Sequence, residues 1–385
     1  MQNYTLKELV LYFLKLGTIG FGGPVALVGY MQRDLVENRK WISEDEYKEG
    51  LALAQLAPGP LAAQLAIYLG FVHYRMLGAT LVGFIFVLPS FIMVVLLGVV
   101  YKLYDGLPWI QAVFYGVGAS VIGIITISSY KLTVKSIGKF TLASFKQNWL
   151  LWLFFIIATI TTLVTQQEQV LLFVAAGILY MLVKAPPKWL NNKTANTIAL
   201  FQIGFWNYES DTLVKIAIFF GKAGAFVFGS GLAIVPFLHA GVVAENHWLT
   251  EQQFVDSVAV AMITPGPVVI TVGFIGYLVA GFAGALVAAL ATFLPCYLFT
   301  IALVPSFKKI AQNKSIKAFV DGITAAVVGA LVGAVVVIAS KSILDISTAL
   351  IAIVTIFALL YIKKIQEPQI IAVAAILGII LKCVI

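Results

Sequence analysis

Apolar residues dominate the chain in long runs, and short polar stretches separate these runs. Runs of roughly bilayer length include residues 77–100, 149–165 and 283–304, and a helix needs about 20 apolar residues to cross a membrane. Because lipid offers no hydrogen-bond partners, only helices or closed barrels cross it. The pattern therefore predicts an all-α polytopic membrane protein.

Composition agrees with this pattern and adds an orientation signal. The chain is 61% hydrophobic and 11% charged, whereas soluble proteins carry about 25% charged residues. The first residues lack the basic patch and cleavage site of a signal peptide, so we expect the first apolar segment to be retained. The net charge of +8 lies mainly in loops and reports topology, because cytoplasmic loops collect Lys and Arg. We expect a multi-pass protein of the plasma (inner) membrane.

One interrupted-helix pattern occurs twice along the chain. Lys15 matches Lys222 and Trp41 matches Trp248 at one constant offset of 207 residues, and after a single-residue slip the register continues at 206. This shared spacing predicts an internal duplication. The predicted domains are residues 1–190 for the first repeat, 191–211 for a polar linker and 212–385 for the second repeat.

The lysine-rich loops exchange places between the two halves. The first half has its basic loop at 131–146 and the second half at 308–317, and the counterpart of each is nearly neutral. Because basic loops stay in the cytoplasm, this exchange predicts two inverted-topology repeats. We count one broken span, one re-entrant hairpin and four plain spans per half, which makes about five crossings per repeat and places both termini outside.

The second unit of each half carries the signals of a helical hairpin. Ser43 and Thr250 are predicted N-caps, and Glu46 and Gln253 complete capping boxes three residues later. A helix over 44–57 would be roughly 21 Å long, too short to cross a core of about 30 Å. Pro-Gly-Pro then ends it, because proline removes a donor and glycine permits a reversal. The unit is therefore expected to re-enter rather than cross.

The first unit of each half is interrupted as well. We expect residues 6–36 to form a single span broken at 22–24. Each break exposes backbone N–H groups at the start of the next helix, where partial positive charge binds anions. This arrangement suits a tetrahedral oxyanion, although glycines that only permit tight helix packing remain an alternative. The predicted binding residues at the breaks are Gly22, Gly23, Pro24, Pro58, Gly59, Pro60, Gln64, Gly229, Ser230, Gly231, Thr264, Pro265, Gly266 and Pro267.

Charged residues in apolar surroundings are further candidates. Lys15 and Lys222 are symmetry mates inside apolar segments, so they either supply charge to the anion or snorkel to the interface. Glu49 and Asp256 each precede a tip by nine residues. They are candidates for proton coupling, with solvation at the hairpin mouths as the alternative. Asp321 is a third proton-coupling candidate, or merely ends a span.

The residues that would support an enzyme are missing from the pattern. The two cysteines and three histidines have no shared ligand spacing, and the Gly-rich stretches are not phosphate loops. We therefore expect no enzyme, no cofactor and no metal. The expected partners are a small oxyanion, protons and the lipid bilayer, without nucleic acid.

These motifs resemble those of the chromate ion transporter family. The resemblance rests on Phe21-Gly-Gly-Pro24, on Gln55-Leu-Ala-Pro-Gly-Pro60, and on the second-half forms Phe228-Gly-Ser-Gly231 and Ile263-Thr-Pro-Gly-Pro267. It covers essentially the whole chain as two fused copies, although the second half has Gly231 where Pro24 stands. The resemblance implies export of chromate, with sulfate as an analogue, driven by the proton gradient. A homodimer is compatible with it.

Two other functions remain open on the residues alone. The same architecture suits uptake of sulfate or a related oxyanion, because no residue encodes direction. Opposed hairpin tips with few charges also suit an anion channel. Saturable flux that depends on a proton gradient distinguishes a transporter from a channel.

Overall fold

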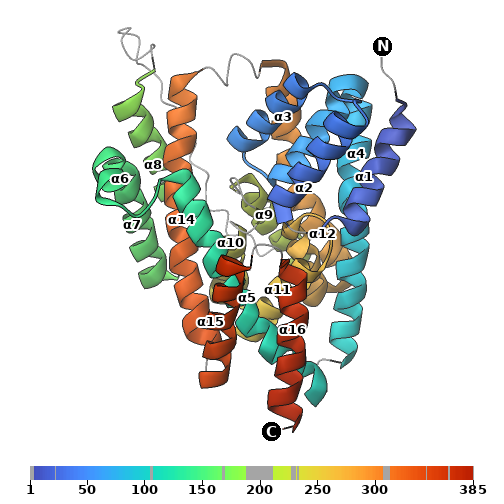
Figure 1. Ribbon diagram of the computed structural model, residues 1–385, viewed down its shortest axis with the longest axis vertical. Coiled ribbons are helices and arrows are strands. Elements are labelled where there is room, and N and C mark those ends of the chain that lie inside the picture. The colour runs from blue at the N-terminus through green and yellow to red at the C-terminus, as the bar shows by residue number, and fades with distance from the viewer. Residues whose placement is uncertain are drawn as a thin grey trace.

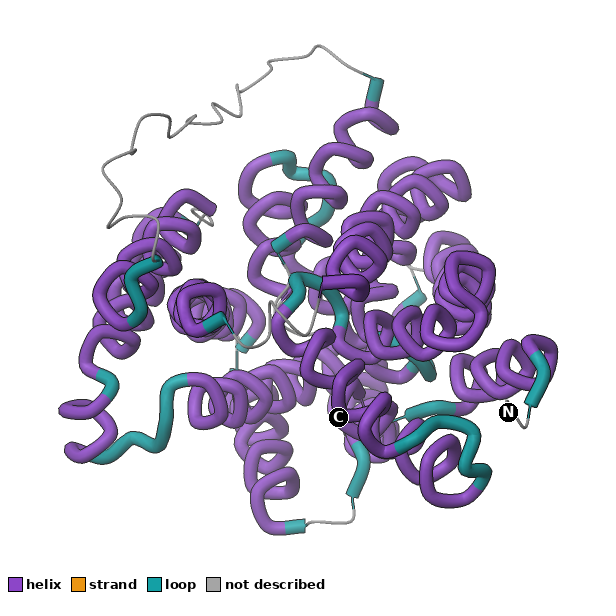
Figure 2. Tube along the Cα trace, turned by 90° about the horizontal axis from the view of Figure 1, so that it is seen from above, coloured by secondary structure: helices purple, strands orange, loops and turns teal. Residues whose placement is uncertain are grey.

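The computed structural model describes residues 4–21, 23–104, 107–166, 170–187, 211–226, 231, 234–306, 313–343, 345–362 and 365–384. Figure 2 shows helices joined by loops, and the described residues include no β-strand. The predicted linker, apart from Asp211, lies outside the described residues, as do Gly22, Gly229 and Ser230.

The main helices follow the same order in both halves, with a few short helices that differ. The first half contains α1 (Leu6–Ile19), α2 (Gly23–Met31), η1 (Gln32–Asn38), α3 (Glu44–Leu56), α4 (Leu61–Tyr104), α5 (Pro108–Ser136), α6 (Leu142–Gln147), α7 (Trp149–Thr165) and α8 (Val170–Lys184). The second half contains α9 (Thr212–Ala225), α10 (Ile234–His239), η4 (Ala240–Glu245), α11 (Glu251–Ile263), η5 (Val268–Ile270), α12 (Thr271–Leu303), η6 (Val304–Ser306), α14 (Lys314–Ser342), α15 (Ile346–Tyr361), α16 (Glu367–Ile379) and η7 (Ile380–Val384).

Several of these helices have the length and composition of membrane spans. Within the described part of the chain, four helices are long and apolar enough to cross a bilayer, and three shorter apolar helices accompany them. The long ones are α4, α5, α14, and α12 together with η5. The prediction of an all-helical, polytopic membrane protein is confirmed at this level.

The α3 hairpin forms as its capping signals predict. The Ser43 side chain accepts from the backbone N–H of Glu46, and Glu46 accepts in return from the backbone N–H of Ser43. After the Pro-Gly-Pro tip the chain turns back, so that His73 Nε2 lies 3.3 Å from Glu46 Oε1. Arg75 then has φ 52° and ends the returning arm inside α4. Residues 61–74 and 76–104 are therefore two antiparallel sections of α4.

The first unit is also a hairpin, and the expected single broken span over 6–36 is wrong. The Tyr12 hydroxyl donates to the backbone oxygen of Tyr30 at 3.3 Å, and the rings of Tyr4 and Trp41 stack 4.8 Å apart. The return arm of α2 and η1 thus lies back against α1. Gly23 has φ +71°, a conformation that glycine adopts without strain, and the break reverses the chain instead of continuing it.

The second half repeats both hairpins. Phe219 of α9 stacks on Phe237 of α10, with ring centroids 5.4 Å apart, as Tyr12 meets Tyr30 in the first half. Thr250 and Gln253 form the second predicted capping box at the start of α11. Gly281, with φ +64°, separates the returning arm of α12 from its longer section.

The two long sections, 76–104 of α4 and 282–303 of α12, pack against each other in opposite directions. The hydroxyls of Thr80 and Tyr297 lie 2.5 Å apart near one end. Farther along, the rings of Phe91 and Phe282 lie 6.3 Å apart. The section 76–104 runs beside α1, because the rings of Phe13 and Phe86 lie 6.0 Å apart. Tyr4, at the start of α1, lies against Tyr74, just before that section begins, so the first-half hairpins begin at the end where 76–104 begins.

The termini lie at opposite ends of the long axis (Figure 1). The expectation that both termini face the same side is therefore wrong. The first unit of each half contributes no crossing, because its return arm brings the chain back to the end where the unit begins. The N-terminus lies at the same end as the beginning of α14 (Figure 1).

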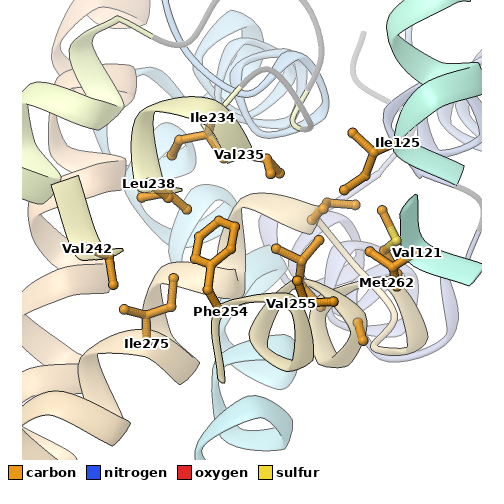
Figure 3. Close-up of a cluster of buried hydrophobic side chains, with 14 of the residues drawn as sticks. Val121, Ile125, Ile234, Val235, Leu238, Val242, Phe254, Val255, Met262 and Ile275 are labelled. Atoms are coloured by element: carbon orange, nitrogen blue, oxygen red, sulfur yellow. The ribbon is translucent and has the colours of Figure 1, made fainter. Parts of the chain in front are cut away.

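Apolar side chains pack around the second-half hairpins. Figure 3 shows residues from α5, α10, α11 and α12 converging, with Phe254 at the centre of the group. Phe254 and Ile275 are fully buried. Burial of a large apolar side chain stabilises a soluble protein by about 1.5–3 kcal/mol. In a membrane protein the close fit of such side chains, rather than their transfer from water, holds the helices together.

Candidate functional site

The tip of the second-half hairpin is docked onto the first half. The backbone N–H of Gly266 donates to the oxygen of Gly20 at 2.9 Å. The hydroxyl of Ser90, on the long section of α4, donates to the oxygen of Pro265 at 2.7 Å. Both groups are deep in the protein, because Ser90 is fully buried. Two breaks that lie far apart in sequence are thus hydrogen-bonded to each other.

The first-half tip contacts the second half at the position that corresponds by the repeat. A Cβ added to Gly59 would lie 3.1 Å from Cβ of Cys296 on α12, and Cys296 is the repeat partner of Ser90 at the offset of 206. Gln64 Nε2 donates to the oxygen of Pro58 at 2.7 Å and closes the tip. The other amide atom, Gln64 Oε1, is buried without a hydrogen-bond partner in the described structure.

Both tips require glycine for two reasons. Gly59 has φ +140° and Gly266 has φ +99°, values that side chains of L-residues rarely tolerate. In addition, a Cβ on Gly266 would lie 2.0 Å from Ser90 Oγ. The prediction that these glycines permit the reversal agrees with this geometry.

The two remaining breaks also approach each other. A Cβ placed on Gly231 would lie 3.7 Å from Cγ of Pro24, so the first-unit breaks of both halves meet at the junction. Pro60 and Pro267 begin the returning arms. Four of the predicted elements, one from each hairpin, therefore face the interior junction between the halves.

The hydroxyl of Thr264, at the second tip, already donates a hydrogen bond within its own helix. Thr264 Oγ1 donates to the oxygen of Val260 at 2.6 Å, one turn back in its own helix. Its single proton is used within the helix in this conformation, and the binding role of Thr264 stays a prediction. Gln64 likewise uses its amide N–H on Pro58.

The two lysines are exposed rather than enclosed at the tips. Lys15 lines a cleft between α1 and the return arm, and this cleft has a cavity volume of about 230 Å³. Arg33 and Arg39 line it too. Sequence reasoning missed both arginines because they lie outside the apolar runs. The signal that was present is the pair Arg33 and Arg39 in the polar stretch after α2, which lies near Lys15 only because the first unit is a hairpin.

The three proton-coupling candidates have different surroundings. Asp256 is buried and accepts from the hydroxyl of Tyr101 and from Gln252 Nε2, both at 2.8 Å. The alternative that placed it in a solvated hairpin mouth is wrong, because Tyr101 of the other half covers it. Glu49 and Asp321 are half-buried.

These features define a class of protein: a multi-pass helical membrane protein with irregular backbone held between two halves, which membranes tolerate only inside protein or beside a cavity. The chain belongs to the chromate transporter family, whose model matches residues 7–181 and 214–379. This is a family of transporters, not of enzymes, and an oxyanion is the substrate that the family implies.

Named relatives cover nearly the whole chain. A chromate transport protein of Cupriavidus metallidurans is 61% identical over 98% of this chain and 94% of its own length. A probable chromate transport protein of Synechococcus elongatus is 57% identical over 98% of this chain and 96% of its own. A chromate transport protein of Pseudomonas aeruginosa is 30% identical over 85% of this chain and 79% of its own. No solved structure matches the chain.

Proposed function

We propose that this protein is a secondary transporter of the plasma membrane that exports a tetrahedral oxyanion, chromate with sulfate as its analogue, coupled to the proton gradient. The single observation that carries the proposal is the near full-length similarity to proteins named for chromate transport. The energetics favour export, because an inside-negative potential drives a dianion outward by about 4.6 kcal/mol per 100 mV.

The two halves act as inverted repeats in this proposal. The opposite directions of 76–104 and 282–303 support it, as does the exchange of basic loops. The hairpins then enter the membrane from opposite faces and meet at the junction. The end of the molecule that carries the N-terminus is cytoplasmic, because the basic residues at the start of α14 lie there.

The oxyanion binds at the junction of the hairpin tips. In the conformation described, the donor of Gly266 and the hydroxyl of Ser90 bind protein oxygens. When the second tip separates from the first half, these donors become available to an anion. The anion's oxygens then replace the protein oxygens as hydrogen-bond acceptors. Rocking of one repeat against the other about a fixed central site is the usual route of alternating access. Lys15 and Lys222 add positive charge along the path.

Asp256 carries the coupled proton, with Glu49 and Asp321 as the other carriers. The support for Asp256 is its burial between the halves, where Tyr101 and Gln252 hold the carboxylate. A change in its protonation therefore alters a contact between the two halves.

The proposal is tested by flux in liposomes that contain the purified protein. Chromate and sulfate movement is measured with and without an imposed pH gradient. We expect saturable chromate flux that the gradient accelerates and that sulfate inhibits. Non-saturating flux that follows only the electrical potential would identify a channel, and flux that favours sulfate entry would identify an uptake transporter.

A further inference from the structure

We propose that the cleft between α1 and the return arm is a recruitment site for the oxyanion on one face of the protein, formed by Lys15, Arg33 and Arg39. This inference rests on the proposed function and deepens it, because it assigns a second binding site outside the hairpin tips. The cleft has a volume of about 230 Å³, which is ample for a tetrahedral oxyanion.

The charges that line the cleft favour an anion. Three cations, Lys15, Arg33 and Arg39, face one carboxylate, Asp34, which leaves a local charge of +2. Arg33 Nε lies 3.2 Å from Asp34 Oδ1 in an exposed pair, and such pairs hold little energy. Among the described residues, none forms an ion pair with Lys15.

Aromatic rings hold both guanidinium groups without neutralising them. Arg39 Cζ lies 4.5 Å from the ring centroid of Trp41 and 5.4 Å from that of Tyr12. Arg33 Cζ lies 5.3 Å from the ring centroid of Tyr30. Stacking leaves the N–H fork of Arg39 for paired hydrogen bonds to an oxyanion. Arg33, whose Nε donates to Asp34, keeps its terminal N–H groups for the anion. The site is thus arranged before any anion arrives.

The cleft leads toward the hairpin tips. Its lining continues from Arg39 past Lys15 to Gly20, and the oxygen of Gly20 accepts from the N–H of Gly266. An oxyanion in the cleft therefore lies next to the contact that separates when the second tip moves. Recruitment and transport would share this one contact.

At the corresponding described positions, the second half lacks the basic residues that line this cleft. At the offset of 207, Ala240 stands for Arg33, Gly241 for Asp34 and Asn246 for Arg39. The ring of Phe219, which stands for Tyr12, packs on Gly241 so closely that an added Cβ would lie 1.9 Å from it. The basic cleft of one face is thus replaced by packed aromatic side chains on the other, and only one face recruits anions.

The test uses the double substitution Arg33→Gln and Arg39→Gln in oriented membrane vesicles that contain the full chain. Radiolabelled sulfate and chromate are offered to each face separately. Charges in a cleft raise the local anion concentration by about tenfold or more. We therefore expect the half-saturation concentration to rise about tenfold when the oxyanion is offered to the cleft face, with the maximal rate retained. Flux from the other face should be unchanged.

Two comparisons separate recruitment from general damage. Lys48→Gln removes one charge outside the cleft, where Lys48 pairs with Glu44 on the exposed surface, and should leave the half-saturation concentration as in the wild type. Added salt should weaken the wild type toward the variant, because a Debye length of about 8 Å at physiological ionic strength screens exposed charges.

The outcomes distinguish this proposal from the proposed function. If the variant matches the wild type from both faces, or is impaired equally from both, the cleft proposal is overturned while export stands. If wild-type vesicles transport neither oxyanion, the proposed function is overturned and the recruitment site with it.

Discussion

The contact between the second tip and the first half can be measured with Gly266→Ala. The new Cβ would lie 2.0 Å from Ser90 Oγ, and the residue would keep φ +99°. The backbone strain costs about 1–3 kcal/mol and the overlap about 1–3 kcal/mol. Loss of the bond from Ser90 to Pro265 adds about 1 kcal/mol. We expect the substitution to destabilise the protein by about 5 kcal/mol in total.

A second substitution isolates the overlap from the strain. Ser90→Ala removes Oγ, after which the nearest Ser90 atom to the new Cβ is its Cβ, at 3.2 Å. Alone, Ser90→Ala should destabilise the protein by about 1–2 kcal/mol, because it leaves a buried oxygen unpaired. In the Gly266→Ala background it should instead restore about 2 kcal/mol, because the overlap disappears.

The measurement is thermal unfolding of the purified protein in detergent, followed by intrinsic fluorescence, together with flux in liposomes. Gly29→Ala is the matched control, because no atom lies within 4 Å of its added Cβ, and it should unfold like the wild type. If Ser90→Ala lowers the unfolding temperature of the Gly266→Ala variant still further, the tip does not contact Ser90 and the docked arrangement is wrong.

Other expectations follow from the same geometry. Gly59→Val should abolish transport while the protein still inserts, since its φ of +140° disfavours any side chain. Normal flux at normal expression would contradict the role of the first tip in transport. Tyr101→Phe removes a hydrogen bond of 2.8 Å to Asp256 and should shift the pH dependence of flux, whereas an unchanged profile would exclude Asp256 as the proton carrier. Single cysteines at Ser136 and Asn313 should react with an impermeant reagent from the same side, and opposite accessibility would refute the inverted repeat.

Local signals in the sequence predicted the hairpins that have strong caps and breakers. Ser43 with Glu46, followed by Pro58-Gly59-Pro60, fixed the limits of α3 to within one residue of the structure. These signals act between neighbours along the chain, so they are readable without tertiary contacts. The repeat offset then carried the same prediction to α11 and its tip.

The features that depend on distant contacts were not predictable in this way. The reversal of the first unit depends on Tyr12 meeting Tyr30 and Tyr4 meeting Trp41, pairs that no local spacing reveals. Arg75 adopts a positive φ without a glycine or proline to signal it.

In the candidate site, too, the residues set by local motifs were predictable and those brought together by distant contacts were not. The glycines of the tips were predictable from their motifs, because a reversal needs them. The burial of Asp256 was not, because the residue that covers it, Tyr101, comes from the other repeat. Arg33 and Arg39 join Lys15 only through the same unforeseen reversal.

The location of the bound substrate tests the central claim most directly. A structure of the protein determined with chromate or sulfate should show an oxyanion within about 10 Å of Gly59 or Gly266, the reach expected of residues that line one small pocket. An oxyanion bound on the transport path farther than this from both tips would contradict the account, even with the fold as described.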